Sequence, residues 1–320
     1  MRNFYCKKIQ NKYKEKESKN MKKNLFAALI GRPNVGKSTL LNQLLGEHIS
    51  IVSPKPQTTR TKITGILTKD ETQFVFLDTP GIHKPKDKLG SYMMKVADGA
   101  AADVDIVLLL VEAGDRVGPV EKELLRRFEN AHTPTILIIN KTDISNANQI
   151  GDTIARFSEN HTYDAVIPIS AKNGENVEII LEEIEKFAME GPWFFPDDII
   201  TDQPERVIAS EIIREKLLNA LGDEIPHGTA VIIESFKEKK DKDKNEMISI
   251  RAEIFCERPS HKPIIIGKNG EMLKKIGSRA REDMENFFGV KIFLDLWVKV
   301  KENWRESAAV VANFGFKDEE

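Results

Sequence analysis

The first two thirds of the chain alternate short apolar runs with segments that repeat apolar residues at the helical period. Buried strands that alternate with helices are typical of a mostly parallel sheet covered by helices on both faces. We therefore predict an α/β domain with a six-stranded sheet over residues 21–190. The expected strands are LFAALIG, ITGILTK, QFVFLD, DIVLLLVEA, TILIIN and AVIPIS, and the expected helices are VEKELLRRFEN, NQIGDTIARFSEN and NVEIILEEIEKFAME.

The pattern changes after a proline-bearing stretch at residues 191–205, which we interpret as a linker. Residues 206–320 follow the order α-β-β-α-α-β, with the two central strands joined by a charged hairpin turn, KEKKDKDKNE. This order predicts a separate small α+β domain. At the other end, residues 1–20 are rich in lysine and lack hydrophobic periodicity, which predicts a disordered tail. Met21 is an alternative start, because MKKNLFAALIG runs directly into the first strand.

Composition narrows the class of protein. A length of 320 residues, with 40% hydrophobic and 31% charged residues, fits two ordinary domains of a soluble globular protein. The formal net charge is −2, so any affinity for nucleic acid must come from local basic segments such as residues 258–281. Two widely separated cysteines indicate a reducing compartment, and no apolar run approaches the roughly 20 residues that span a bilayer. These features predict a cytoplasmic protein.

The segment Gly31-Arg-Pro-Asn-Val-Gly36-Lys37-Ser38 matches the phosphate-loop pattern G-x-x-x-x-G-K-[ST] between a predicted strand and a predicted helix. Its glycines allow backbone N–H groups to surround a phosphate, and the helix N-terminus adds partial positive charge. We expect Lys37 to reach the β- and γ-phosphates and Ser38 to hold Mg²⁺. The predicted nucleotide contacts from this segment are Gly31, Asn34, Val35, Gly36, Lys37, Ser38 and Thr39.

Three further motifs follow predicted strands and favour guanine over adenine. Asp78-Thr-Pro-Gly81 can supply a carboxylate that reaches Mg²⁺ through water and a glycine N–H for the γ-phosphate. In Asn140-Lys-Thr-Asp143, Asp143 can accept hydrogen bonds from the two adjacent N–H donors of guanine, Lys141 can pack over the base, and Asn140 can tie the segment to the phosphate loop. Ser170-Ala171-Lys172 can offer a backbone N–H to the guanine O6. All lie where open α/β sheets bind ligands.

A polar loop between Ser38 and Asp78, running from Pro54 to Arg60, is placed to sense the γ-phosphate. A threonine there can complete the Mg²⁺ shell when the γ-phosphate is present. We favour Thr59, with Thr58 as the alternative, and an ordinary solvated loop is the competing interpretation.

In the second domain, the turn Ile266-Gly267-Lys268-Asn269-Gly270 joins two helical stretches with basic neighbours that include Lys274 and Lys275. A Gly-x-x-Gly turn lets the backbone approach a sugar-phosphate chain closely, and lysines suit phosphate contacts. Together with the α-β-β-α-α-β order, the turn resembles a type II KH domain and predicts RNA binding.

With these motifs assembled, residues 21–315 resemble the Era family of bacterial ribosome-assembly GTPases, through GRPNVGKSTLLNQLLG, QTTR, DTPGIH, NKTD, ASEIIREKLL, GDEIP and IIGKNG. The resemblance implies a Ras-like P-loop GTPase domain followed by a KH domain that recognises the 3′ end of 16S rRNA as the 30S subunit matures. It implies GTP, GDP and Mg²⁺ as ligands, catalytic roles for Lys37, Thr59 and Gly81, and peripheral association with the inner membrane. We also expect a monomer. A signalling switch whose second domain binds protein or membrane is the rival hypothesis.

The position after the Asp-x-x-Gly motif is Ile82, where a Ras-like site places a water-orienting Gln. An isoleucine cannot orient water, so we expect slow intrinsic hydrolysis. Similar GTPases use an asparagine at the position of Asn34 to help coordinate a monovalent cation, which implies activation by K⁺. The alternative is that Asn34 only stabilises the loop.

Overall fold

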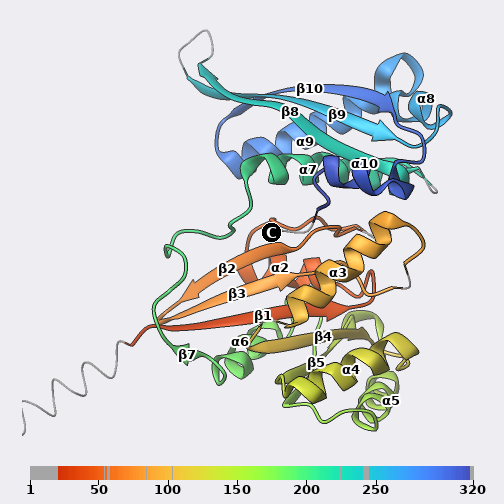
Figure 1. Ribbon diagram of the computed structural model, residues 1–320. Helices are drawn as coiled ribbons and strands as arrows, with labels where there is room; N and C mark the ends of the chain where they lie inside the picture. The colour runs from red at the N-terminus through yellow and green to blue at the C-terminus, as the bar shows by residue number, and fades with distance from the viewer. Residues whose placement is uncertain are drawn as a thin grey trace, which may run out of the picture.

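The computed structural model describes residues 21–317 except 54, 56, 57, 84, 103, 223, 224 and 241–244. The predicted tail at residues 1–20, Gln57 of the predicted sensor loop and the centre of the charged hairpin turn therefore lie outside the described residues. Figure 1 shows two units, one above the other, joined by an extended segment that follows strand β7 (Met189–Glu190) and leads to helix α7 (Glu205–Ala220).

The first unit is built on a mostly parallel sheet. Its six main strands run in the order β2-β3-β1-β4-β5-β6, and only the β2–β3 pair among them is antiparallel. A seventh strand, β7, pairs antiparallel with the start of β1, so the predicted helix over residues 176–190 ends earlier than expected. The six main strands are β1 (Lys23–Gly31), β2 (Ile63–Lys69), β3 (Thr72–Asp78), β4 (Ile106–Glu112), β5 (Thr135–Asn140) and β6 (Ala165–Pro168).

Both faces of this sheet are buried because its central strands are apolar along most of their length. Along β4, Leu108 packs into the cluster under α2 and α6, while Leu109 packs into the cluster under α4 and α5. Helix α3 was not predicted, since its two glycines and polar residues weaken the helical period. The helices are α2 (Lys37–Leu45), α3 (Lys88–Ala102), α4 (Pro119–Ala131), α5 (Ala147–Ser158) and α6 (Val177–Glu185), with a 3₁₀ turn at Thr142–Ile144.

The second unit is a three-stranded sheet, in the order β10-β9-β8, whose apolar face packs on α7 and α9. Strands β8 and β9 are antiparallel, whereas β10 is parallel to β9 and forms an edge. The observed elements follow the predicted order, and a C-terminal helix, α10, was not predicted. The elements after α7 are β8 (Thr229–Lys240), β9 (Glu246–Cys256), α8 (His261–Ile266), α9 (Glu271–Phe288), β10 (Lys291–Val300) and α10 (Ala308–Asn313), with 3₁₀ turns at Pro226–Gly228, Lys268–Gly270 and Trp304–Glu306.

The two units share an apolar cluster. Leu89 and Met93 of α3 pack with the fully buried Trp304 and with Val311 of α10. Beside it, the buried guanidinium of Arg60 donates to the carbonyl oxygens of Thr229 (2.6 Å) and His227 (2.8 Å). The end of the predicted sensor loop is therefore anchored to the second unit. Within the described residues, no helix is both long and apolar enough to cross a membrane.

Candidate nucleotide and RNA sites

The phosphate loop joins the end of β1 to the start of α2. Gly36 has φ 101°, and a Cβ there would lie 2.1 Å from Nδ2 of Asn140, so the loop requires glycine at this position. No side chain caps the N-terminus of α2. Its N–H groups and the partial positive charge of the helix are therefore available to an anion.

Lys37 is a buried cation at the centre of the loop, with 6% of its surface exposed. Its Nζ donates to the carbonyl oxygens of Gly31 (3.1 Å) and Arg32 (2.9 Å). Burial lowers the pKa of Lys37 to about 8, although the nearby Asp78 carboxylate opposes the shift. A phosphate group bound at the loop would place a negative charge next to this buried ammonium and so favour its charged form.

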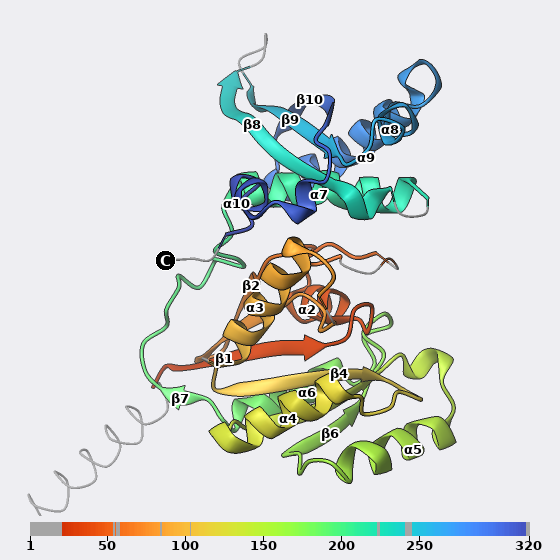
Figure 2. The ribbon, with the colours of Figure 1, turned by 45° about the vertical axis from the view of Figure 1, so that its right-hand side comes forward.

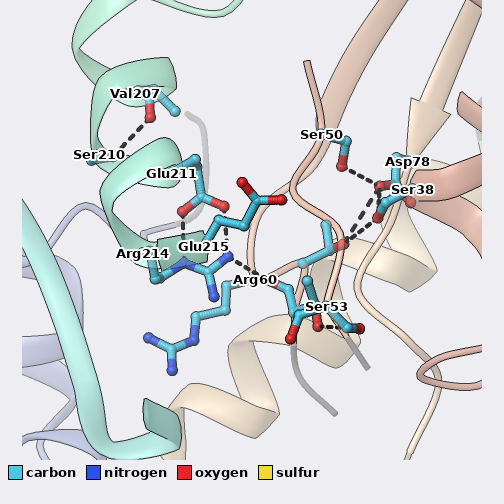
Figure 3. Close-up of polar contacts among 12 residues, drawn as sticks. Ser38, Ser50, Ser53, Arg60, Asp78, Val207, Ser210, Glu211, Arg214 and Glu215 are labelled. Carbon is cyan, nitrogen blue, oxygen red and sulfur yellow. Dashed lines mark hydrogen bonds and ion pairs between the residues drawn. The ribbon is translucent and has the colours of Figure 1, made fainter. Parts of the chain in front are cut away.

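Three hydroxyl groups surround the buried Asp78 carboxylate. The Oδ2 atom accepts from Ser38 Oγ (2.7 Å) and Ser50 Oγ (2.8 Å), and Thr59 Oγ1 lies 3.0 Å from Ser38 Oγ (Figure 3). Burial raises the pKa of Asp78, and its Oδ1 has no hydrogen-bond partner among the described residues. The hydroxyls of Ser38 and Thr59 and the carboxylate of Asp78 are hard oxygen ligands of the kind that Mg²⁺ prefers. The residues present therefore fit that ion.

The two candidate threonines are placed differently. Thr59 is buried beside Ser38 and Asp78, whereas Thr58 Oγ1 donates to the Lys55 carbonyl (2.5 Å). Ser50 could not be predicted from the sequence, because a lone serine after an apolar residue carries no motif. The structure thus groups Thr59, rather than Thr58, with the candidate Mg²⁺ ligands.

The predicted base-reading residues meet at the carboxyl ends of β5 and β6. Asn140 Nδ2 donates to the Val35 carbonyl (2.7 Å), and its Oδ1 accepts from the Ala171 N–H (2.9 Å). Asp143 Oδ1 accepts from Ser170 Oγ (2.9 Å), which orients the exposed carboxylate. These contacts hold the NKTD and SAK segments against the phosphate loop. Lys141, in a left-handed conformation, forms an ion pair with Glu112, and Lys172 is exposed.

The segment after Asp78 packs directly on the phosphate loop. A Cβ at Gly81 would lie 2.5 Å from the backbone of Pro33, and the Ile82 N–H donates to the Gly31 carbonyl (3.0 Å). Ile82 itself is 4% exposed and belongs to the core. Its side chain cannot contact an attacking water.

The Gly-x-x-Gly turn of the second unit borders a shallow groove. Gly267, Asn269 and Gly270 all have positive φ, and a Cβ at Gly267 would meet the backbone of Met272 at 2.8 Å. Of the predicted RNA contacts, Gly270 and Lys274 line the groove, Lys268 and Lys275 are exposed, and Ile266 packs partly into the core. Arg281, which belongs to the basic flank noted in the sequence, also lines the groove. The sequence did not single out the rest of the lining, which comprises Leu273, Gly277, Ser278, Leu294 and Leu296.

The predicted sensor loop lies between the candidate Mg²⁺ ligands and helix α7. Arg214 of α7 donates to the Thr58 carbonyl and to Glu211. Figure 3 shows Arg214 and Glu211 facing one another on α7. Glu215, one residue further along α7, accepts from His48 Nε2 and from the Val52 N–H, both at 3.1 Å. The hydrogen bonds from His48 and Lys216 outweigh burial and lower the pKa of Glu215 to about 2.

Two separate parts of the chain match known families. Residues 26–141 match a family described as 50S ribosome-binding GTPase, and residues 224–305 match the KH domain family. A protein named GTPase Era from Caldanaerobacter subterraneus subsp. tengcongensis is 50% identical over 291 residues, which cover 91% of this chain and 97% of that protein. GTPase Era from Clostridioides difficile (strain 630) is 48% identical over 299 residues, covering 93% and 100%.

Two solved structures of Era also match most of this chain. A complex of Era with MgGDPNP and nucleotides 1506–1542 of 16S ribosomal RNA matches with a TM-score of 0.87 at 40% identity, covering 92% of this chain and 99% of that one. Era from Aquifex aeolicus, as a variant bound to GDP and AlF4⁻, matches with a TM-score of 0.86 at the same identity and coverage.

Proposed function

This chain belongs to the Era family of GTPases, and on that premise we propose which of its residues bind GTP and which bind RNA. The chain binds and hydrolyses GTP in its first domain and binds 16S rRNA through its KH domain. The assignment of residues rests on one observation above the others. The NKTD and SAK segments are hydrogen-bonded to the phosphate loop through both polar atoms of Asn140.

In the nucleotide site, Lys37 and the N–H groups at the start of α2 hold the phosphates, and Asp143 reads the guanine base. Ser38, Thr59 and Asp78 hold Mg²⁺, with Asp78 acting through water. When bound, Mg²⁺ supplies positive charge that offsets the negative charge of the phosphates. Gly81 offers its N–H to the γ-phosphate, and the hydroxyl of Ser50 keeps Asp78 oriented.

Hydrolysis in this site is slow without help, because the buried Ile82 cannot orient water. We propose that K⁺ accelerates it. Asn34 lies at an exposed left-handed position of the phosphate loop, and its side-chain oxygen is the proposed ligand for a cation beside the phosphates.

The second domain holds single-stranded RNA in the groove beside the turn at residues 267–270, where Lys268, Lys274 and Arg281 face the phosphates. Family membership further suggests that the partner in the cell is the 30S subunit. It also suggests that the protein is a cytoplasmic monomer with peripheral contact at the inner membrane.

The nucleotide assignment is tested by GTP hydrolysis with Asp78→Asn, which removes the charge of the carboxylate but keeps its shape. We expect turnover to be lost at millimolar Mg²⁺. The matched control is Asp152→Asn on the exposed surface of α5, where Asp152 forms an ion pair with Arg156, 3.6 Å away. Equal turnover by Asp78→Asn and the wild type would contradict the proposed metal site.

A further inference from the structure

We propose that the open face of the KH-domain sheet is a second RNA-binding surface, on which Phe293 and Trp297 of β10 stack against bases that leave the groove. This proposal rests on the proposed function, because it assumes that the groove itself binds RNA. It adds a surface on the opposite side of the strand that forms the groove wall.

The two aromatic side chains stand out because they are exposed. Phe293 is 57% exposed and Trp297 is 54% exposed, although large aromatic side chains are usually buried. They lie four residues apart on β10, which places them about 13 Å from one another along the strand. The alternate residues Ile292 and Val298 belong to the domain core. Phe293 and Trp297 therefore project from the face that α7 and α9 do not cover.

Neighbouring elements cover only one end of that face. Phe255 of β9 packs on Phe314, which follows α10, at a ring-centroid distance of 4.7 Å. In Figure 2, α8 and α9 lie on one side of the sheet, and α10 lies at its lower end. Phe293 and Trp297 make no ring contact with another described aromatic residue.

Polar contacts hold this surface in a defined arrangement. Asp295, between the two aromatic residues, accepts from the indole Nε1 of Trp297 (3.0 Å) and from Arg251 Nε on β9 (3.1 Å). The indole and the guanidinium are both planar groups with π-faces that can stack on bases. Because one carboxylate orients both groups, less conformational freedom is lost when a base stacks on them.

The charge of the face suits a polyanion. Its two acidic groups, Asp295 and Glu253, are each paired with a cation, Arg251 and Lys299 respectively. The strand register places three further exposed cations on the same face, namely Lys237, Lys239 and Lys291. The described part of the face thus has a net positive charge and two exposed aromatic residues, which is the composition of surfaces that bind single-stranded nucleic acid.

The face is continuous with the groove, since both belong to edge strand β10. Leu294 and Leu296 line the groove opposite α9, and a Cβ at Gly277 would lie 3.3 Å from Leu296. Phe293, Asp295 and Trp297 occupy the alternate positions on the other side. An RNA strand that crosses the free edge of β10 therefore passes from the leucine-lined groove to the aromatic face. This continuity and the positive charge favour RNA over a protein partner.

The test compares two RNA probes on the full chain by fluorescence anisotropy. The long probe has the sequence of nucleotides 1506–1542 of 16S rRNA. The short probe is a single strand of about four nucleotides from its 3′ end, the length that a KH groove clamps. The Phe293→Ala/Trp297→Ala double variant is expected to bind the long probe at least about tenfold more weakly and the short probe equally well. Trp297→Phe should retain most of the affinity, and Phe194→Ala, which alters an exposed aromatic residue of the linker, should change nothing.

A second readout follows the fluorescence of Trp297 in a Trp193→Phe background, where the remaining Trp304 is buried. Stacking on a base predicts quenching by the long probe and not by the short one. The proposal is overturned if the double variant binds the long probe like the wild type, or if it weakens both probes equally. The Lys268→Asp/Asn269→Asp variant reports on the groove separately. If that variant binds both probes normally, the proposed function fails instead.

Discussion

The proposed nucleotide site and the proposed RNA groove differ in whether their charged groups are buried or exposed. In the nucleotide site, the charged groups are buried and bonded to one another: Lys37 is 6% exposed, and Asp78 is fully buried among three hydroxyls. In the groove, Lys268, Lys274 and Arg281 are exposed, and the floor is aliphatic. The first site can reject a ligand that differs by one hydrogen-bonding group, whereas the second relies on charge and shape.

The two sites also differ in how the chain fixes their geometry. In the nucleotide site, hydrogen bonds of the buried Asn140 join the ends of two strands to the phosphate loop. The groove has a rigid turn at Gly267, but its remaining wall depends on strand β10 of the sheet. Single substitutions should therefore have large, specific effects in the first site and smaller, salt-dependent effects in the second.

The largest expected effect is that of Asp143→Asn on base specificity. The variant loses the carboxylate that accepts from guanine, so GTP affinity should fall by about 10³-fold or more. An asparagine amide can instead donate to the extra carbonyl of xanthine, so XTP should become the preferred nucleotide. Competition binding of GTP and XTP measures the change, and an unaltered preference for GTP would exclude the base-reading role.

The next effect is confined to the second site. Replacing Lys268 and Asn269 with Asp places two carboxylates where phosphates are expected, so affinity for the 16S rRNA 3′-end probe should fall by about 10- to 100-fold. GTP affinity should be unchanged, because neither residue lies near the phosphate loop. Filter binding and nucleotide titration on the same samples check both expectations. Equal RNA affinities would rule out the groove.

A smaller effect is the pH dependence of GTP affinity, which arises from the buried Lys37. The pKa of Lys37 in the free site is about 8, and bound phosphate should raise it. Below pH 8 the lysine is already charged, so GTP affinity should be nearly constant. Above pH 8 binding must take up a proton, so affinity should fall by up to about tenfold per pH unit. Calorimetry at pH 8.5 in buffers of different ionisation enthalpy measures this uptake, with pH 7 as the control. Zero uptake at pH 8.5 would contradict the assignment.

The smallest effect is the cation dependence of hydrolysis. We expect GTP turnover to be about fivefold faster in K⁺ than in Na⁺ or Cs⁺ at equal ionic strength, a difference of roughly 1 kcal/mol in the barrier. Asn34→Ala should remove the difference. Identical rates in all three salts would leave Asn34 with a structural role only.

Much of the nucleotide site could be predicted from the sequence, because phosphate binding requires fixed residue types at fixed spacing. The strands could also be predicted, since β1 and β4 are apolar along most of their length. Ser50, helix α10 and strand β7 were missed because their positions depend on partners that are distant in the chain. Met189–Glu190, for example, forms a strand only because it reaches Lys23 and Asn24. The wall of the RNA groove was missed for the same reason, since Leu294 and Leu296 follow the turn by more than 20 residues.

The central claim, that this protein combines a nucleotide site of buried groups with an RNA site of exposed charges, is tested most directly by salt dependence. The affinities for GTP and for the 16S rRNA 3′-end probe should be measured on the wild-type chain from about 50 to 200 mM KCl at constant free Mg²⁺. The account predicts a steep log–log slope for RNA, about −0.7 for each phosphate neutralised, and a much shallower slope for GTP. Equal slopes for the two ligands would contradict it.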